Sequence, residues 1–198
     1  MDDSPVFGDK QSIRARAFEI IKKHSFRFGD FTLSSGAKST YYLDMKPSMF
    51  HPEGVAVLAQ LVLDRIEGLN VDYIGGMEMG AVPLIAPVVL LSGNRLLSGS
   101  RHRPISGFFV RQQKKKHGTQ KLVEAPEGAL SGTNVVILDD VTTTGDSAMQ
   151  AAKAAEDERA KVALVLSIVD REAGADELFR KADLPFDALF RASAFLPR

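Results

Sequence analysis

The segment VVILDDVTTTGDS, residues Val135–Ser147, limits the possible folds of this chain more than any other stretch. Four apolar residues lead without interruption into two adjacent carboxylates, Asp139 and Asp140, and then into a turn of hydroxyls and glycine. An apolar run without polar alternation is typical of a strand that is buried on both faces of a parallel sheet. Ligands bind at the carboxyl ends of such strands. The segment therefore predicts a buried strand that ends in a binding site.

The other apolar patterns alternate between helical and strand-like segments. Apolar side chains recur at helical spacing in three segments: 12–23, with Ser12 as the N-cap, 54–66 and 146–158. A further apolar run, which is helical or buried, begins at Ala81. Strands are predicted at 31–33, 40–43, 71–74, 107–110, 135–138 and 162–169, with a turn at 34–36 and a polar loop from 111 to about 124. This alternation predicts an α/β fold with a mainly parallel, twisted sheet flanked by helices.

Composition favours one globular domain without a global charge bias. The chain has 198 residues, of which 44% are hydrophobic, and this is enough for a single domain with a full core. Lys and Arg together number 25, as do Asp and Glu, so no overall field attracts nucleic acid or an anionic membrane. Any anion that binds must therefore be held by a local site.

The sequence also carries no feature of secretion or membrane insertion. It contains no cysteine, which excludes disulfides and thiolate metal sites and suits a reducing cytoplasm. The N-terminal residues lack the apolar core of a signal peptide. The most apolar run, Ala81–Leu91, is well short of the roughly 20 residues of a membrane span, and it contains Pro83 and Pro87. We therefore expect a cytoplasmic protein that contacts no membrane.

The hydroxyl-rich turn, Thr142–Ser147, has the composition of a phosphate site. Backbone N–H groups and hydroxyls can surround a small anion there, and the positive end of the following helix adds to the attraction. Asp139 and Asp140, the acidic pair, lie too close to the turn to bind the same phosphate without repulsion. Carboxylates at that distance suit sugar hydroxyls or a metal ion. A simple cap at a strand end would account for one acid and one threonine, but poorly for the whole series.

Two other phosphate motifs do not match. The segment SGAKST has Ala37 and Thr32 where a P-loop requires its two glycines. A phosphatase that forms an aspartyl phosphate needs a second acid two residues after its nucleophile, and Val141 and Thr142 occupy those positions.

The segment Val135–Ser147 resembles the phosphoribosyl-pyrophosphate (PRPP) signature of type I phosphoribosyltransferases. Three further segments are similar to those of orotate phosphoribosyltransferases: FGDFTLSSGAKSTYYLD (Phe28–Asp44), RQQKKKHG (Arg111–Gly118) and DREAG (Asp170–Gly174). The four blocks follow the order of that family and span most of the chain. The resemblance implies a transfer of the 5-phosphoribosyl group from PRPP to orotate, which yields orotidine 5′-monophosphate and pyrophosphate in UMP biosynthesis.

The resemblance also implies an architecture and a set of roles for PRPP. A single phosphoribosyltransferase domain would span 1–198, with a small N-terminal hood from about 12–48, a core of about 52–190 and a flexible catalytic loop. Thr143–Ser147 would anchor the 5′-phosphate, the acidic pair would hold the ribose, and the loop would neutralise the leaving pyrophosphate. The implied PRPP residues are Arg111, Lys115, His117, Asp139, Asp140, Val141, Thr142, Thr143, Thr144, Gly145, Asp146 and Ser147. Among them, Arg111, Lys115, His117, Asp139 and Asp140 would be catalytic.

The implied cofactor is Mg2+, bound mainly through oxygens of the substrate rather than by a metal site of the protein. His117 could also donate a proton, because an imidazole changes charge near neutral pH. From its composition alone, the basic segment Arg111–Gly118 would instead be a solvated surface loop. In relatives this loop reaches the neighbouring subunit's site, so the resemblance implies a homodimer that shares its catalytic loops.

Arg171 is the strongest candidate for orotate, because a planar guanidinium matches a planar acid. An ion pair with Asp170 or Glu172 is the alternative. The implied orotate residues are Thr143, Arg171, Tyr42, Leu43 and Lys46. The glycine turn, Gly75–Ala81, corresponds to the pyrophosphate-binding turn of relatives, or is an ordinary turn between strand and helix.

The chain departs from the family at three positions. Many relatives have lysine where Ser34, Gln112 and Met79 stand here. The absence of these three positive charges is compatible with weaker PRPP binding or with a different acceptor base. Two other functions therefore stay open, a phosphoribosyltransferase for another base and a regulator that senses PRPP.

Overall fold

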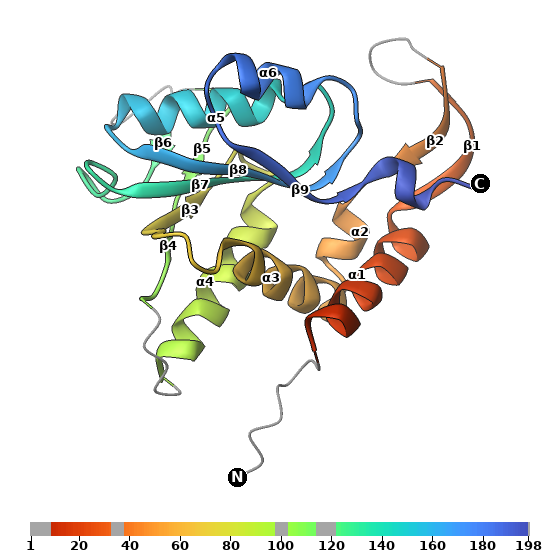
Figure 1. Cartoon of the computed structure of the whole chain (residues 1–198), viewed down its shortest axis with the longest axis horizontal. Coiled ribbons are helices and arrows are strands. Elements are labelled where there is room, and N and C mark those ends of the chain that lie inside the picture. The colour runs from red at the N-terminus through yellow and green to blue at the C-terminus, as the bar shows by residue number, and fades with distance from the viewer. Residues whose placement is uncertain (1–8, 33–37, 98–102, 114–121, 198) are drawn as a thin grey trace.

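The computed structural model describes residues 9–32, 38–97, 103–113 and 122–197 (Figure 1). Its centre is a five-stranded sheet in which every neighbouring pair is parallel. The strand order is β4 (Ser106–Gly107), β3 (Tyr73–Gly75), β7 (Asn134–Thr142), β8 (Lys161–Asp170) and β9 (Phe186–Arg191). The predicted α/β fold with a mainly parallel sheet is confirmed, and the apolar run of the opening segment forms the central strand, β7.

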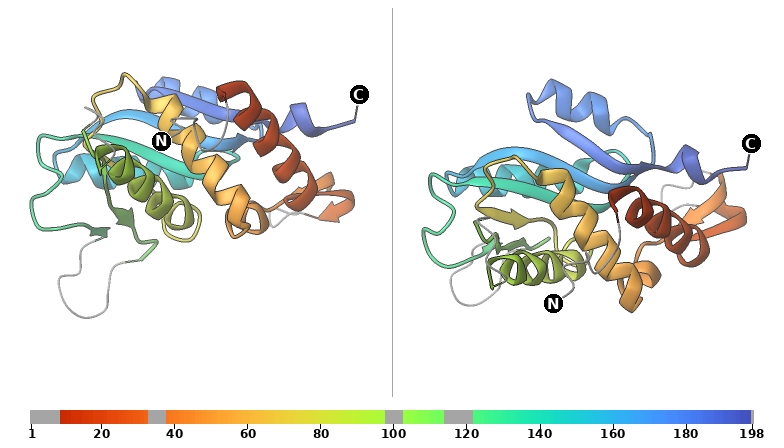
Figure 2. Two further views of the ribbon diagram at one scale, coloured as in Figure 1. Left: turned by 90° about the horizontal axis from the view of Figure 1, so that it is seen from below. Right: turned by 60° about the horizontal axis from the view of Figure 1, so that its bottom comes forward.

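Helices cover both faces of this sheet. In Figure 1, α5 (Asp146–Asp157) and α6 (Ala175–Lys181) lie above it, and α1 (Lys10–His24), α3 (Pro52–Ile66) and α4 (Val82–Leu97) lie below; Figure 2 shows the lower layer from its own side. Val135 and Ile137 of β7 pack in the core under α5, whereas Val136 and Leu138 pack in the core with α3 and α4. Because successive strand residues face opposite layers, both sets are apolar.

A smaller unit, called the hood below, lies at one end of the sheet and omits the first helix that the predicted hood of about 12–48 includes. It comprises the antiparallel hairpin of β1 (Phe26–Thr32) and β2 (Lys38–Leu43), followed by the short helix α2 (Lys46–Met49). The Phe26 ring stacks on Tyr41 at a centroid distance of 5.6 Å and on Phe195 at 4.6 Å. Phe195 belongs to the 3-10 helix η1 (Ala192–Phe195). The C-terminal segment therefore attaches the hairpin to the core through stacked rings.

The helices at 12–23, 54–66 and 146–158, the helical run from Ala81 and the strands at 71–74, 135–138 and 162–169 are confirmed, with shifted boundaries. The predicted N-cap of the first helix is wrong. Asp9 is the cap, because its carboxylate accepts a hydrogen bond of 2.7 Å from the backbone N–H of Ser12. Both hairpin strands are confirmed and extend further toward the N-terminus than predicted, and the predicted turn at 34–36 lies outside the described residues.

One predicted strand is divided in the structure. The segment 107–110 does not form a single strand, because β4 ends at Gly107 and pairs with β3, whereas β5 (Phe109–Val110) pairs antiparallel with β6 (Val123–Glu124). Phe108 lies between them with its ring against Gly75, where any side chain would collide with it. The buried ring thus marks the point where the chain leaves one sheet for the other. The elements α2, β6, α6, β9 and η1 were not predicted.

No helix within the described ranges has the length and apolar character needed to cross a membrane.

Candidate active site

The acidic pair lies within the last residues of β7, not in a turn after it. The strand continues to Thr142 because Thr142 pairs with Asp170 of β8. Asp139 is only 8% exposed, and its Oδ2 accepts a hydrogen bond of 2.8 Å from the hydroxyl of Thr142. Oδ1 of Asp140 accepts a bond of 2.9 Å from the backbone N–H of Val141. Strand pairing therefore fixes the backbone that carries both carboxylates.

Burial makes these carboxylates easy to protonate. Removal of water raises the pKa of Asp139 to about 6. Burial, and next the charge of Asp139, raises the pKa of Asp140 to about 7, against a smaller opposing effect of Lys46. Such raised pKa values are typical of groups held ready for a ligand. Hydroxyl donors or a cation would stabilise the ionised pair and lower both values.

The hydroxyl-rich turn keeps its backbone donors available. Gly145 has φ +92°, and a Cβ there would lie 2.9 Å from the ring of Phe179, so only glycine suits both the conformation and the space. The first N–H of α5 that bonds back into the turn is that of Met149, which donates to the Gly145 carbonyl at 2.8 Å. The N–H groups of Thr143–Ser147 donate to no acceptor among the described residues. Five amides at a helix start can therefore surround an anion.

The hydroxyls of the turn differ in their accessibility. Thr143 and Ser147 are exposed, and Thr144 Oγ1 donates to Oδ2 of Asp146 at 2.7 Å. Thr142 is fully buried and its hydroxyl is bonded to Asp139. The amides without a described acceptor thus belong to Thr143–Ser147, whereas the hydroxyl of Thr142 orients a carboxylate.

The glycine turn packs directly against the end of β7. A Cβ at Gly76 would collide with the carbonyl oxygen of Leu138, and one at Gly80 would lie 2.8 Å from Oδ1 of Asp140 and 3.8 Å from Oδ1 of Asp139. Met79 has φ +64° and a side chain that is 62% exposed. The sequence analysis singled out this turn but did not foresee that Gly80 contacts the acidic pair.

Arg111 lies at the base of the basic loop. Its Nε donates to Oε1 of Glu124 at 2.7 Å, across the β5–β6 pair. The Gln112 N–H donates to Oε1 of Glu78 at 3.0 Å, which links the loop to the glycine turn. The sequence analysis missed Glu124 and Glu78, because only the pairing of β5 with β6 and the turn after β3 bring them to Arg111 and Gln112. Lys115 and His117 lie outside the described residues.

Arg171 follows β8, and its backbone N–H donates to the Thr142 carbonyl at 2.8 Å. Its guanidinium carbon lies 4.9 Å from the centroid of the Tyr41 ring. The alternative ion pair with Asp170 or Glu172 is not formed: Asp170 accepts from the Glu172 N–H at 2.8 Å, and Glu172 accepts from a backbone N–H of η1 at 2.9 Å. Arg171 instead contacts Tyr41, which was not among the predicted orotate residues.

The remaining predicted orotate residues come from the hood. Tyr42 is 41% exposed, whereas the side chain of Leu43 is buried in the core, so only its backbone could contact a ligand. Lys46 Nζ lies 3.2 Å from Oδ1 of Asp44, and its charge acts on Asp140. The hydrogen bond to Asp44 raises the pKa of Lys46 most strongly. The negative charges of Asp44 and Asp140 also favour the charged amine. The acidic pair thus lies between the glycine turn and a lysine of the hood.

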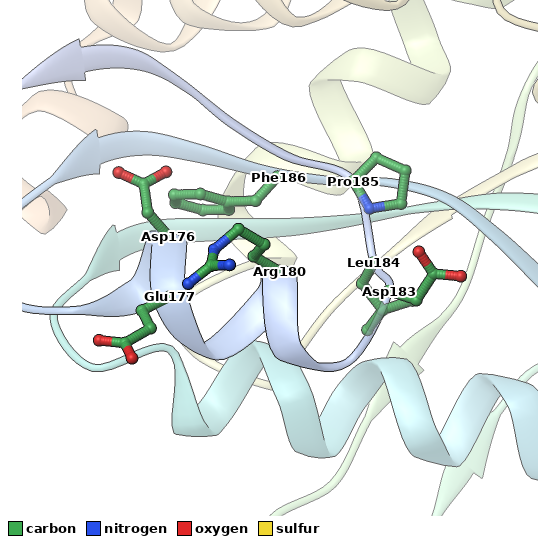
Figure 3. A pocket seen from close by; sticks show the side chains of 7 residues that line it. All are labelled: Asp176, Glu177, Arg180, Asp183, Leu184, Pro185 and Phe186. Carbon is green, nitrogen blue, oxygen red and sulfur yellow. The ribbon is translucent and has the colours of Figure 1, made fainter.

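A separate hollow of about 610 Å3 lies between α6 and the start of β9 (Figure 3). Its lining contains none of the predicted site residues; it is formed by Asp176, Glu177, Arg180, Asp183, Leu184, Pro185 and Phe186. Three carboxylates and one guanidinium would repel a phosphate rather than attract it. The lining of this hollow therefore does not suit a phosphate.

No protein-family model matches the chain, but many curated proteins do. The orotate phosphoribosyltransferase of Bradyrhizobium diazoefficiens is 47% identical over 189 residues, which cover 94% of this chain and 98% of that protein. That of Methanosphaera stadtmanae is 36% identical over 181 residues, 91% of this chain and 94% of the relative. The chain belongs to the orotate phosphoribosyltransferase family.

Solved structures of this family share the fold. Orotate phosphoribosyltransferase of Mycobacterium tuberculosis, in complex with Fe(III) dicitrate, superposes with a TM-score of 0.77 at 30% identity, over 92% of this chain and 98% of that one. The same enzyme in complex with PRPP has a TM-score of 0.73 at 27% identity, with the same coverage. An adenine phosphoribosyltransferase from Thermoanaerobacter pseudethanolicus has a TM-score of 0.64 at 18% identity, over 88% of this chain and 99% of that one. The fold alone therefore does not select the base.

The raised pKa values predict a pH dependence of stability. Between about pH 4 and pH 7 the folded acidic pair binds more protons than the unfolded chain, so its contribution to the unfolding free energy falls as pH rises. Asp140→Asn removes one of these groups and keeps an oxygen that accepts from Val141. From pH 5.5 to pH 8 the wild type should lose about 2 kcal/mol relative to the variant in urea denaturation. Parallel pH profiles of the two proteins would contradict the burial of this charge.

Proposed function

We propose that this protein transfers the 5-phosphoribosyl group of PRPP to orotate, yielding orotidine 5′-monophosphate and pyrophosphate in the de novo synthesis of UMP. The observation that carries the proposal is the juxtaposition of the acidic pair with five backbone amides at the start of α5 that donate to no described residue. Membership of the orotate phosphoribosyltransferase family over nearly the whole chain supports the choice of orotate.

In this proposal PRPP binds at two points of one strand end. The N–H groups of Thr143–Ser147 hold the 5′-phosphate, and this remote binding energy positions the anomeric carbon. The ionised acidic pair accepts hydrogen bonds from the ribose hydroxyls. As the bond to pyrophosphate lengthens, positive charge grows on the sugar ring, and the two carboxylates stabilise it, as in glycoside hydrolysis.

The pyrophosphate gathers negative charge as it leaves. Arg111, Lys115 and His117 would supply positive charge there, and His117 could donate a proton. Thr142 and Val141 already donate to the acidic pair, and Mg2+ prefers six oxygens, so two carboxylates can provide only a minority of its ligands. Among the described residues, no group of three or more His, Asp or Glu side chains could hold a metal ion. The residues thus fit a Mg2+ ion that is bound mainly by the substrate and neutralises its pyrophosphate.

The acceptor base would bind between β8 and the hood. Arg171 would pair with the carboxylate of orotate, because its guanidinium makes no bond to a described carboxylate. Thr143, Lys46, Tyr42 and the backbone of Leu43 would contact the ring and its edge. This placement brings the reacting ring nitrogen toward the sugar held at β7.

An assay of orotate consumption with PRPP and Mg2+ tests the proposal, and we expect turnover by the wild type. Asp139→Asn and Asp140→Asn should each lower kcat/KM for PRPP roughly 100-fold, about 2.7 kcal/mol of transition-state stabilisation, while both proteins stay folded at pH 8. Turnover only with a purine or uracil would reassign the base. PRPP binding without turnover of any base would indicate a regulator.

The contact of the glycine turn with the acidic pair predicts the effect of Gly80→Ala. The added methyl group lies 2.8 Å from Oδ1 of Asp140, so the carboxylate must move, and KM for PRPP should rise roughly tenfold. The matched control is Gly93→Ala, because a Cβ at Gly93 of α4 meets nothing within 4 Å of its own chain; since Gly93 shares a helix face with Leu90, gel filtration should first show that this variant keeps the oligomeric state of the wild type. Equal KM values in the two variants would mean that the position of Asp140 does not limit PRPP binding.

We also propose a cytoplasmic homodimer that shares its catalytic loops. An apolar face of α4 supports the dimer: Ala86 is exposed, and Leu90 and Leu97 are 63% and 85% exposed. Exposed apolar side chains along one face of a helix are typical of an interface. The second copy would then bring its basic loop to the first copy's acidic pair.

Loop sharing predicts complementation between two inactive variants. Lys115→Ala and Asp140→Asn homodimers should both have low kcat. A heterodimer purified through two different tags contains one site with both changes and one site with neither, if the loop acts on the neighbouring subunit. Its activity per dimer should then be about half that of the wild type. A heterodimer as inactive as the two homodimers would show that each loop acts on its own subunit.

A further inference from the structure

The Tyr41 ring and the Arg171 guanidinium form a contact between the hood and the end of β8. Tyr41 lies in β2, and Arg171 directly follows β8, so residues 130 positions apart meet here. The guanidinium carbon lies 4.9 Å from the ring centroid, within the range of a cation–π interaction. We propose that Tyr41 is a positioning residue, which holds Arg171 ready for the planar carboxylate of the acceptor base. This inference rests on the function proposed above.

Arg171 has no competing carboxylate among the described residues. Its neighbours in the sequence are occupied, since Asp170 accepts from the Glu172 N–H and Glu172 accepts from the Ser193 N–H. Glu172 also lies 4.0 Å from Arg191. A guanidinium that stacks on a ring face keeps its N–H donors at the edge. Those donors can therefore meet a planar acid without first breaking an ion pair.

The ring beneath Arg171 is itself firmly held. Tyr41 is half-buried, and its ring stacks on Phe26, which stacks in turn on Phe195 at 4.6 Å. Phe26 and Phe195 are both buried. The Ser39 hydroxyl donates to the Tyr41 carbonyl at 2.6 Å and fixes the backbone. Tyr41 is thus the outer member of a row of rings that begins in the core.

This support matters because an arginine side chain is flexible. A free guanidinium must lose rotamer freedom when it binds an anion, and that loss weakens binding. A stacking partner on a rigid ring imposes part of this order before the ligand arrives. The effect should concern the acid bound by Arg171, and it should leave the phosphate held by Thr143–Ser147 unaffected.

The test compares Tyr41→Leu with Tyr41→Phe in the orotate assay. Leucine keeps an apolar side chain without a π face, so KM for orotate should rise about tenfold while KM for PRPP stays within about twofold. Phenylalanine keeps the ring and should restore the wild-type KM for orotate. Phe50→Leu is the control, because Phe50 follows α2, is 68% exposed and makes no ring contact among the described residues; its KM values should match those of the wild type.

Four results would overturn the inference. Wild-type turnover with an unchanged KM for orotate in Tyr41→Leu would remove Tyr41 from base binding and leave the proposed function intact. A parallel rise of both KM values, or a failure of Tyr41→Phe to restore the wild type, would show that Tyr41 only stabilises the hood. Absence of orotate turnover by the wild type would refute the proposed function itself, and the role of Tyr41 with it. Conversely, Tyr41→Leu should have little further effect in an Arg171→Ala background, because coupled residues are not additive.

Discussion

The burial of two neighbouring carboxylates at the end of β7 is the interaction on which the site depends. β7 is covered on both faces, so its last residues leave the core with little water around them. The protein gives the acidic pair only a few compensating donors, the hydroxyl of Thr142 and the N–H of Val141 among them, and the pKa values of both carboxyls remain raised. Folding thus maintains an unfavourable charge arrangement that a ligand with hydroxyl groups and a cation can relieve.

Three predicted site cations that the structure describes are held in different ways. Lys46 pairs with Asp44, and Arg111 pairs with Glu124, whereas Arg171 lies over the ring of Tyr41. Ion pairs in partly exposed places are weak and exchange readily, so Lys46 and Arg111 can move to a phosphate oxygen. A ring, in contrast, leaves the hydrogen-bond donors of a guanidinium unused. Lys46 and Arg111 would therefore have to leave a carboxylate before they contact a ligand, whereas the guanidinium of Arg171 would not.

The sequence predicted the centre of this site better than its borders. Four apolar residues before the acidic pair were sufficient to predict β7 and its double-faced burial. The turn chemistry of TTTG wrongly suggested that the strand ends at Leu138, because pairing of Thr142 with Asp170 extends it by four residues. The division of 107–110 between two sheets and the contact of Arg111 with Glu124 depend on pairing across long segments, which no local periodicity records. Tyr41 was missed for the same reason, since its selection over Tyr42 depends on the packing of the hood.

The glycine turn shows why a family likeness does not carry over residue by residue. Met79, which stands where the family resemblance implies a lysine, occupies a left-handed conformation with most of its side chain in solvent. A left-handed conformation costs a residue other than glycine about 1 kcal/mol. The turn nevertheless keeps this conformation and its close approach to Asp140, although Met79 carries no positive charge. Within the described part of the turn, only backbone N–H groups can then meet an anion, and Glu78 already accepts from the loop. If pyrophosphate leaves from this site as proposed, its charge would therefore have to be neutralised by Arg111, the rest of the basic loop and Mg2+ rather than by a side chain of this turn.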